Sequence, residues 1–94
     1  MTVYPSLNIT IPTAFSPNND GINDQWNIEA LVGYPNCLVD IYTRYGTLIF
    51  HSKGYTKPWD GTLRGNQLSS GTYYYVIDLG NNLPKLSGYV AIIR

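Results

Sequence analysis

The sequence has only one cysteine and one histidine, Cys37 and His51. A single cysteine rules out an internal disulfide and any zinc site built from several cysteines. Nucleophilic catalysis needs a base beside its serine, threonine or cysteine, and His51, at the end of an expected strand, is the only imidazole for that role. We therefore expect Cys37 to be a small buried thiol and the domain to be non-catalytic.

A net charge and long apolar runs are also missing. Six basic residues balance six acidic ones, so no long-range field would attract a nucleic acid or an anionic membrane surface. There is no run of about 18 apolar residues, and residues 1–15 lack the basic start and apolar block of an export signal. We interpret residues 1–94 as one domain, with its core in residues 7–94, excised from a larger protein that carries any such signal upstream.

What the sequence does contain is typical of short strands between sharp turns. It has nine tyrosines, two tryptophans, nine glycines and six prolines, without an amphipathic pattern of helix length. About seven short antiparallel strands at this spacing predict an all-β, immunoglobulin-like β-sandwich. The expected strands are residues 7–11, 26–31, 38–45, 47–51, 72–79 and 86–93, with one brief strand between residues 59 and 71.

Two of these segments carry more specific expectations. Gly46 marks the turn of a hairpin, because glycine can take the positive φ of a tight turn. The strand after Gly71 is apolar on both sides, which predicts burial of both faces, and a tyrosine near its start would form the corner bond typical of such sandwiches. The alternation of residues before Gly46 does not decide which of two sets of side chains points into the core. One set is Val39, Ile41 and Thr43, and the other is Leu38, Tyr42 and Arg44.

Oxygen-bearing side chains gather around Gly21, a composition that suits a hard cation such as calcium. Gly21 would take the obligatory turn of a calcium loop. Two carboxylates in the loop would bind calcium weakly, so Asp60 is expected to contribute from outside it. The alternative is that these side chains only cap turns through hydrogen bonds to their own backbone. The expected loop ligands are Asn18, Asp20, the Ile22 carbonyl and Asp24.

The aromatic residues have two interpretations. They could form a platform on which sugars stack, because aromatic faces with polar tips suit carbohydrate recognition. Core packing is the plainer alternative, because a sandwich this small must fill its interior with some of these rings. The residues concerned are Trp26, Tyr34, Tyr42, Tyr45, Tyr55, Trp59, Tyr73, Tyr74, Tyr75 and Tyr89.

The run from Pro12 to Asp24, followed by Trp26, closely resembles the opening of the gliding-motility-associated C-terminal domain family. The resemblance covers roughly residues 7–94. Two departures concern Asn19, where the family usually has glycine, and residues 68–69, where it usually has a hydrophobic residue and proline. Further phrases in the family's order are Tyr34-Pro35-Asn36, Val39-Asp40-Ile41-Tyr42, Arg44-Tyr45-Gly46, Ile49-Phe50, Gly54-Tyr55, Pro58-Trp59-Asp60-Gly61-Thr62, Gly71 to Ile77 and Gly88 to Arg94.

The resemblance implies a type B sorting signal of the type IX secretion system, at the end of a larger secreted or cell-surface protein. It implies an immunoglobulin-like fold without catalysis, recognised by the outer-membrane translocation machinery or a dedicated outer-membrane partner. We expect the loops around Asp20 and Trp59 to form the docking face, because loops carry function more often than strands do. With the last strand added, the candidate partner-binding residues are Trp59, Asp60, Gly88, Tyr89 and Arg94.

Two other functions compete with sorting. One is a calcium-stabilised adhesive or carbohydrate-binding module, which a glycan array would detect. The other is a small hydrolase, against which the lack of a base paired with a nucleophile already counts. Fusing residues 7–94 to a periplasmic reporter discriminates sorting from both.

Overall fold

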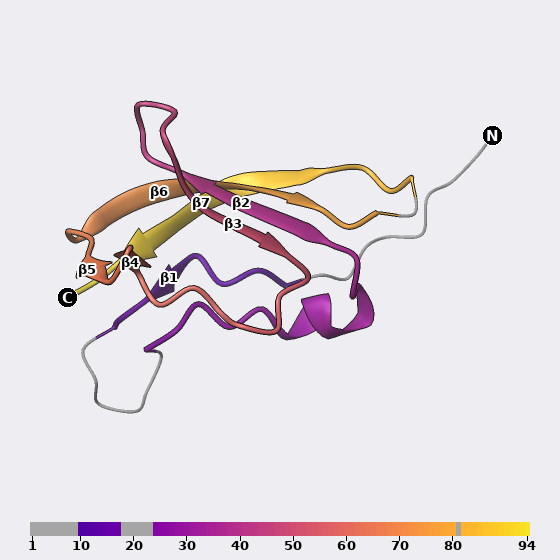
Figure 1. Ribbon diagram of the computed structural model, residues 1–94, viewed down its shortest axis with the longest axis horizontal. Coiled ribbons are helices and arrows are strands. Elements are labelled where there is room, and N and C mark those ends of the chain that lie inside the picture. Colours follow the sequence, from indigo (N-terminus) through magenta and orange to yellow (C-terminus); the bar gives the residue numbers. More distant parts are fainter. Residues whose placement is uncertain (1–9, 18–23, 81) are drawn as a thin grey trace.

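The computed structural model describes residues 10–17, 24–80 and 82–94, and Figure 1 traces the elements they form. This part of the chain contains seven strands and one 3₁₀ helix, η1, at Glu29–Gly33. None of its helices is long and apolar enough to cross a membrane. The strands are β1 (Ala14–Phe15), β2 (Leu38–Tyr42), β3 (Leu48–Lys53), β4 (Thr62–Leu63), β5 (Asn66–Gln67), β6 (Gly71–Asp78) and β7 (Leu86–Ile92).

Five of the strands form one sheet in the order β1, β7, β6, β2 and β3. Neighbouring strands in it are antiparallel, except that the short β1 lies parallel to β7. A second layer faces this sheet. It is formed by the segments around η1 and residues 54–61, which are joined by a bridge between Trp26 and Trp59 (Figure 1). The all-β prediction is confirmed, and the arrangement is consistent with an immunoglobulin-like sandwich.

One face of the sheet is packed and the other is open to solvent. In β2 the buried side chains are Val39 and Ile41, which identifies the inner face that periodicity left open. In β6 Tyr73 and Ile77 are buried on the same side, but Tyr74 is 46% exposed on the other. The expectation that this strand is buried on both faces is wrong, because an antiparallel sheet in a two-layer fold needs only one packed face.

The segment predicted as a strand at residues 26–31 forms an isolated bridge and a helical turn instead. The N–H of Leu31 donates to the carbonyl of Ile28, three residues back, at 3.1 Å. Ile28 and Leu31 are both buried, whereas Val32 is 86% exposed. A spacing of three between buried residues matches the repeat of a 3₁₀ helix, and it does not match the alternation of a strand.

The first strand also differs from the prediction. Residues 7–9 of the expected strand lie outside the described residues, and Thr10 and Ile11 belong to no strand. The first strand of the described chain is β1, which begins after Pro12 and pairs with β7. Proline has no backbone N–H to donate to a ladder, so it separates the alternating residues before it from the paired residues after it.

The turns explain the remaining boundaries. Between residues 59 and 71 the chain forms a β4–β5 hairpin, where the sequence predicted one brief strand. Arg64 and Gly65 have φ of 54° and 82° at its turn, and two successive positive φ angles are typical of a type I′ hairpin. At the β2–β3 turn, Gly46 has φ 83°, which confirms the glycine turn predicted there.

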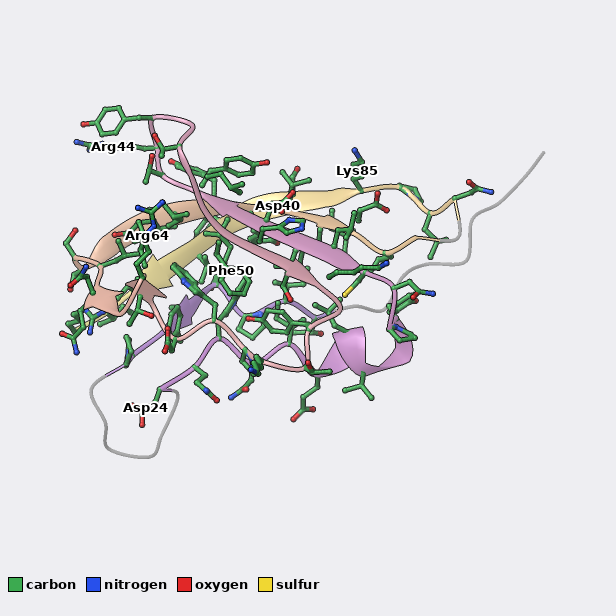
Figure 2. All side chains as sticks on the ribbon, in the orientation of Figure 1. Asp24, Asp40, Arg44, Phe50, Arg64 and Lys85 are labelled. Carbon is green, nitrogen blue, oxygen red and sulfur yellow. The ribbon has the colours of Figure 1, made fainter. Side chains whose placement is uncertain are left out.

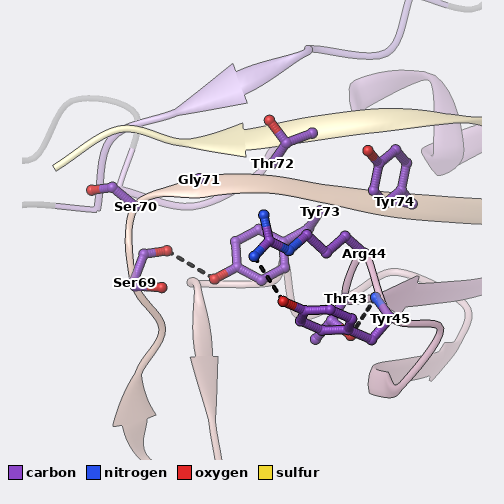
Figure 3. A pocket seen from close by; sticks show the side chains of 9 residues that line it. All are labelled: Thr43, Arg44, Tyr45, Ser69, Ser70, Gly71, Thr72, Tyr73 and Tyr74. Atoms are coloured by element: carbon purple, nitrogen blue, oxygen red, sulfur yellow. Dashed lines mark hydrogen bonds between the residues drawn. The ribbon is translucent and has the colours of Figure 1, made fainter.

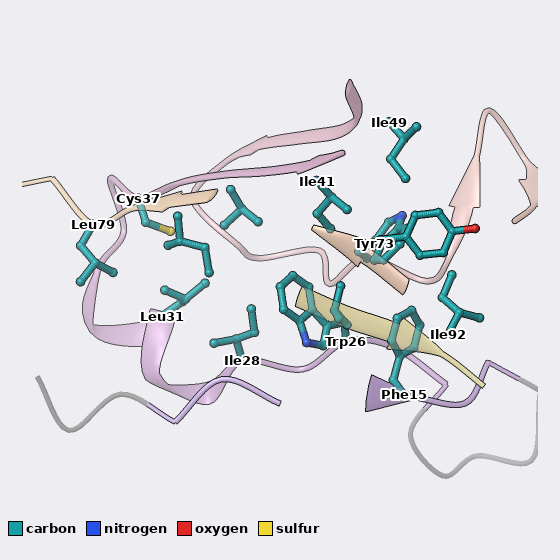
Figure 4. Close-up of a cluster of buried hydrophobic side chains, with 14 residues drawn as sticks. Phe15, Trp26, Ile28, Leu31, Cys37, Ile41, Ile49, Tyr73, Leu79 and Ile92 are labelled. Carbon is teal, nitrogen blue, oxygen red and sulfur yellow. The ribbon is translucent and has the colours of Figure 1, made fainter. Parts of the chain in front are cut away.

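Most of the buried side chains between the two layers are aliphatic, and the two tryptophans are the largest of them all (Figure 4). Trp26 and Trp59 are 0% and 1% exposed. The centroid of the Trp59 ring lies 5.8 Å from that of Tyr73, and the centroid of Trp26 lies 5.3 Å from that of Tyr75. Cys37 is buried at the edge of this core, as predicted, and burial raises the pKa of its thiol. The core is therefore built around the two tryptophans.

Tyr55 ties the two tryptophan segments together through its hydroxyl group. The hydroxyl donates to the Trp26 carbonyl at 2.6 Å and accepts from the Trp59 N–H at 2.9 Å. Burial raises the pKa of Tyr55 far above its ordinary value of 10.0, although the Trp59 N–H bond acts in the opposite direction. The folded domain therefore favours the protonated phenol, which can both donate and accept.

We expect Tyr55→Phe to lower the free energy of unfolding by about 2 kcal/mol, because two buried backbone groups lose their partner while the ring stays. The contribution of the phenol is complete below its ordinary pKa of 10.0 and is lost as the pH rises from there towards the raised value. Urea unfolding followed by tryptophan fluorescence at neutral and alkaline pH measures both effects. Tyr89→Phe, on the exposed face, is the control, and equal losses in both variants would contradict this role of Tyr55.

Candidate functional site

The final strand, β7, lies inside the sheet, where it has a neighbour on each side. It pairs with β6 from Gly71↔Ile92 to Ile77↔Leu86, and it pairs with β1 on its other side. Val90 and Ile92 point into the core and are 0% and 1% exposed. Loss of this strand would therefore open the core and remove the only sheet partner of β1 in the described chain.

The two candidate partner-binding residues within β7 have different surroundings. Gly88 lies opposite Tyr75, and a Cβ atom at Gly88 would stand 2.6 Å from the Tyr75 hydroxyl. The glycine therefore makes room for a ring that packs on Trp26, which is a packing role and leaves no side chain for a partner. Tyr89 is 53% exposed on the outer face of the sheet, in register with Tyr74.

Arg94 binds three loop carbonyls at the end of the sandwich where β7 finishes. Its guanidinium donates to the carbonyls of Leu68 at 2.8 Å, Pro17 at 3.0 Å and Gly61 at 3.4 Å. Its backbone N–H donates to the Ser70 hydroxyl at 3.2 Å. The side chain thus connects the end of β7 to the segment after β1 and to both sides of the β4–β5 hairpin. Its planar fork of donors suits this geometry better than a lysine ammonium would.

Asp60 lies beside Arg94, and the two line an open pocket of about 240 Å³. One carboxylate oxygen of Asp60 accepts from the Thr62 N–H at 3.1 Å and from the Thr62 hydroxyl at 2.6 Å. This is the turn-capping role that the sequence offered as one alternative. Trp59, the neighbouring candidate, is only 1% exposed. Its ring supports this surface from the core, so direct contact with a partner does not fit its placement.

The predicted calcium ligands can be placed only in part. Asn18, Asp20 and Ile22 lie outside the described residues. Asp24 and Asp60 line the same pocket, together with Gln25. Across residues 10–17, 24–80 and 82–94, no group of three or more His, Cys, Asp and Glu side chains is placed to hold a metal ion. Calcium binding therefore stays a prediction.

Sequence reasoning missed a second pocket, of about 590 Å³, between the β2–β3 turn and the start of β6 (Figure 3). On one wall, Arg44 donates to the Tyr45 hydroxyl at 2.7 Å and lies 4.9 Å from the centroid of that ring. On the other, the Tyr73 hydroxyl donates to the Ser69 carbonyl at 2.8 Å, which confirms the predicted corner bond. The sequence signals were the glycines at residues 46 and 71, which mark the two adjoining turns.

The aromatic residues divide between the core and the surface. The buried rings include Trp26, Trp59 and Tyr73, so core packing accounts for the largest of them. The rings of Tyr45, Tyr74 and Tyr89 are between 46% and 79% exposed. The remaining candidates, Tyr34, Tyr42, Tyr55 and Tyr75, are partly buried. A single stacking platform made of all ten rings is therefore not present.

The family model of the CHU_C type IX secretion signal domain matches residues 9–92. The chain belongs to this family. The type IX assignment expected from the sequence is therefore confirmed, and the domain is a sorting signal for that secretion system. The family is a class of secretion signals and not of enzymes. Membership implies a protein that is exported through the outer membrane to the cell surface or beyond.

The domain also resembles part of a solved structure, PorZ from Porphyromonas gingivalis, with a TM-score of 0.70 and 22% sequence identity. PorZ is described as an essential bacterial surface component of the type IX secretion system. The match covers 93% of this chain but only 12% of PorZ, so the chain corresponds to one small part of that protein. At 22% sequence identity, this structural similarity is evidence for the fold alone. No curated protein sequence matches the chain.

We expect Arg94→Ala to lower the free energy of unfolding by about 2 kcal/mol, because three loop carbonyls lose a charged donor. Arg94→Lys should recover part of this loss, because an ammonium group can reach fewer of the carbonyls at once. Thermal unfolding at neutral pH measures the effect. Lys85→Ala, at an exposed position before β7, is the control, and an Arg94→Ala variant as stable as this control would refute the connecting role.

The calcium prediction is tested by following thermal unfolding while calcium is added. A ligand that binds only the folded state raises the unfolding midpoint, so calcium at millimolar concentration should stabilise the domain. Magnesium at the same concentration controls for ionic strength. Asp20→Asn and Asp24→Asn should abolish the shift if the loop binds calcium. An unchanged midpoint in the parent chain would exclude the site.

Proposed function

We propose that the secretion machinery recognises this sorting signal as a folded shape rather than as a linear tail. The observation that carries the proposal is the set of bonds from Arg94 to three loop carbonyls, together with the internal position of β7. A linear signal would need a mobile, accessible stretch of chain. Residues 86–94 instead belong to β7 and to the contacts of Arg94 beyond it.

We place the docking face at the end of the sandwich where Asp60 and Arg94 line one pocket. Both residues are exposed, and they carry opposite charges. Each side chain bonds to a backbone group of a neighbouring segment, Asp60 to the Thr62 N–H and Arg94 to the Leu68 carbonyl. A rigid polar end of this kind can be matched by a partner at little entropic cost, because its loops are already ordered. The partner is the outer-membrane translocation machinery or a dedicated outer-membrane protein, and the passenger is an upstream cargo domain.

The test is a fusion of residues 7–94 to a periplasmic reporter in a bacterium that has the type IX system. We expect the fusion to appear outside the cell and a truncation lacking residues 88–94 to leave the reporter in the periplasm. The Val90→Asp substitution distinguishes recognition of a folded shape from recognition of a linear tail. It keeps almost the whole tail sequence but puts a carboxylate into a fully buried position of β7, so it should unfold the domain and block export.

Ser87→Asp is the matched control, because the same carboxylate is then placed at an exposed position of the same strand. It should be exported like the parent fusion. Circular dichroism of the isolated domains reports whether each variant folds. Export of an unfolded Val90→Asp fusion would refute recognition of a folded shape, and export of the truncated fusion would refute the role of β7.

A further inference from the structure

The free edge of the sheet is β3, whose neighbour within the described chain is β2 alone. The N–H of Gly54 donates to the Cys37 carbonyl at 2.6 Å, in the same register as the β2–β3 pairs. Along an antiparallel edge strand, the backbone groups of every second residue bond to the neighbouring strand. The N–H and C=O groups of Ser52 and Phe50 therefore also point towards β2. The backbone N–H and C=O groups of His51 and Lys53 therefore point away from the sheet. These are the groups that an added strand would pair with.

The chain around this edge is cationic although the protein as a whole is neutral. Residues 41–59 contain half of the basic residues and the histidine but none of the six acidic residues. The nearest carboxylate across the sheet is that of Asp40, on β2, and it is already paired with His51 on the outer face. Figure 2 shows Asp40 in the sheet and Arg44 at the β2–β3 turn. The positive side chains are Arg44 in the β2–β3 turn, Lys53 on β3 and Lys57 in the segment that follows, and all three are exposed.

The opposite edge of the sheet, β1, is less suited to pairing with an added strand. There β1 is only two residues long, and Phe15 within it is buried. At β3 the strand is six residues long, and Leu48 is 50% exposed at its start. Two copies of the chain joined through their β3 strands would bring cations of both copies together, which opposes self-pairing. Charge and length therefore favour a different chain with acidic side chains.

We propose that β3 binds an extended acidic segment of the outer-membrane partner, which adds to the sheet as a sixth strand. The proposal rests on the function proposed above and names the chemistry of its partner. Main-chain hydrogen bonds to His51 and Lys53 supply affinity, and glutamate or aspartate side chains pair with Lys53 and Lys57. Because the surface charges are exposed, binding weakens as the salt concentration rises.

The binding test uses the chain and a short synthetic peptide of alternating valine and glutamate. We expect the peptide to shift the amide resonances of His51 and Lys53 and to slow their hydrogen exchange. A peptide with lysine in place of glutamate, and a glutamate peptide methylated on its backbone nitrogens, are the control probes. Resonance changes centred elsewhere, equal binding of the lysine peptide, or no binding at all would overturn the proposal.

Two kinds of variant separate the backbone and charge contributions. His51→Pro removes an N–H that points away from β2, so the existing ladder keeps its bonds while affinity should fall about fivefold. The double substitution Lys53→Glu and Lys57→Glu should lower the affinity for the acidic peptide several-fold and raise the affinity for the lysine peptide. Lys85→Glu, immediately before β7, which lies three strands from β3 in the sheet order, is the charge control and should change the affinity for neither peptide.

The reporter fusion distinguishes failure of this inference from failure of the sorting proposal. If the parent fusion is exported and the folded Lys53→Glu, Lys57→Glu fusion stays in the periplasm, the β3 edge is a second surface that the partner must bind. If the parent and this variant are exported equally, the edge inference is wrong while sorting stands. Sedimentation showing a dimer that His51→Pro abolishes would identify a second copy as the occupant and would also overturn the acidic partner.

Discussion

The second layer of the sandwich has few backbone hydrogen bonds, so it depends on the contact between Trp26 and Trp59. The N–H of Trp26 donates to the Trp59 carbonyl at 2.8 Å, and the Tyr55 hydroxyl bonds to both segments. The indole N–H groups reach further, to the carbonyls of Pro12 at 2.7 Å and Thr62 at 3.2 Å. Each tryptophan therefore fills the core and also satisfies backbone groups that have no strand beside them. Side chains here replace the ladder of a second full sheet.

The end of the sandwich that carries Asp60 and Arg94 is connected to this core through a short series of contacts. The ring centroid of Phe15, in β1, lies 5.5 Å from that of Trp59, and β1 is held by β7. Arg94 lies two residues after the end of β7 and bonds to the carbonyl of Gly61, which is itself two residues after Trp59. Loss of packing at the tryptophan would consequently loosen the loops that Arg94 holds. The order of the proposed docking face therefore depends on the packing of the core behind it.

Sequence patterns predicted the parts of this fold that depend on local chemistry. The hairpin at Gly46, the strands around Val39 and Ile77, and the corner bond of a tyrosine after Gly71 all follow from turn residues and alternation. The 3₁₀ helix at residues 29–33 was missed, because a short apolar run does not reveal whether its period is two or three. At the site, Asp60 and Arg94 are exposed and their role in partner binding stays a prediction, whereas the burial of Trp59 depends on distant residues that no local pattern contains.

Charge balance in the sequence excludes a long-range field, yet it says nothing of how charges are distributed after folding. Of the cations in residues 41–59, Lys53 lies on the edge strand β3 and Arg44 in the turn before it, while Asp24 and Asp60 line the pocket at the end where β7 finishes. Screening limits such fields to about 10 Å at ordinary ionic strength, so each surface acts only on a partner that is already close. On the proposed function, a neutral domain with separated charges would discriminate between partners only at the docking step, when they are already in contact. Such short-range discrimination is what the proposed recognition of a folded shape requires.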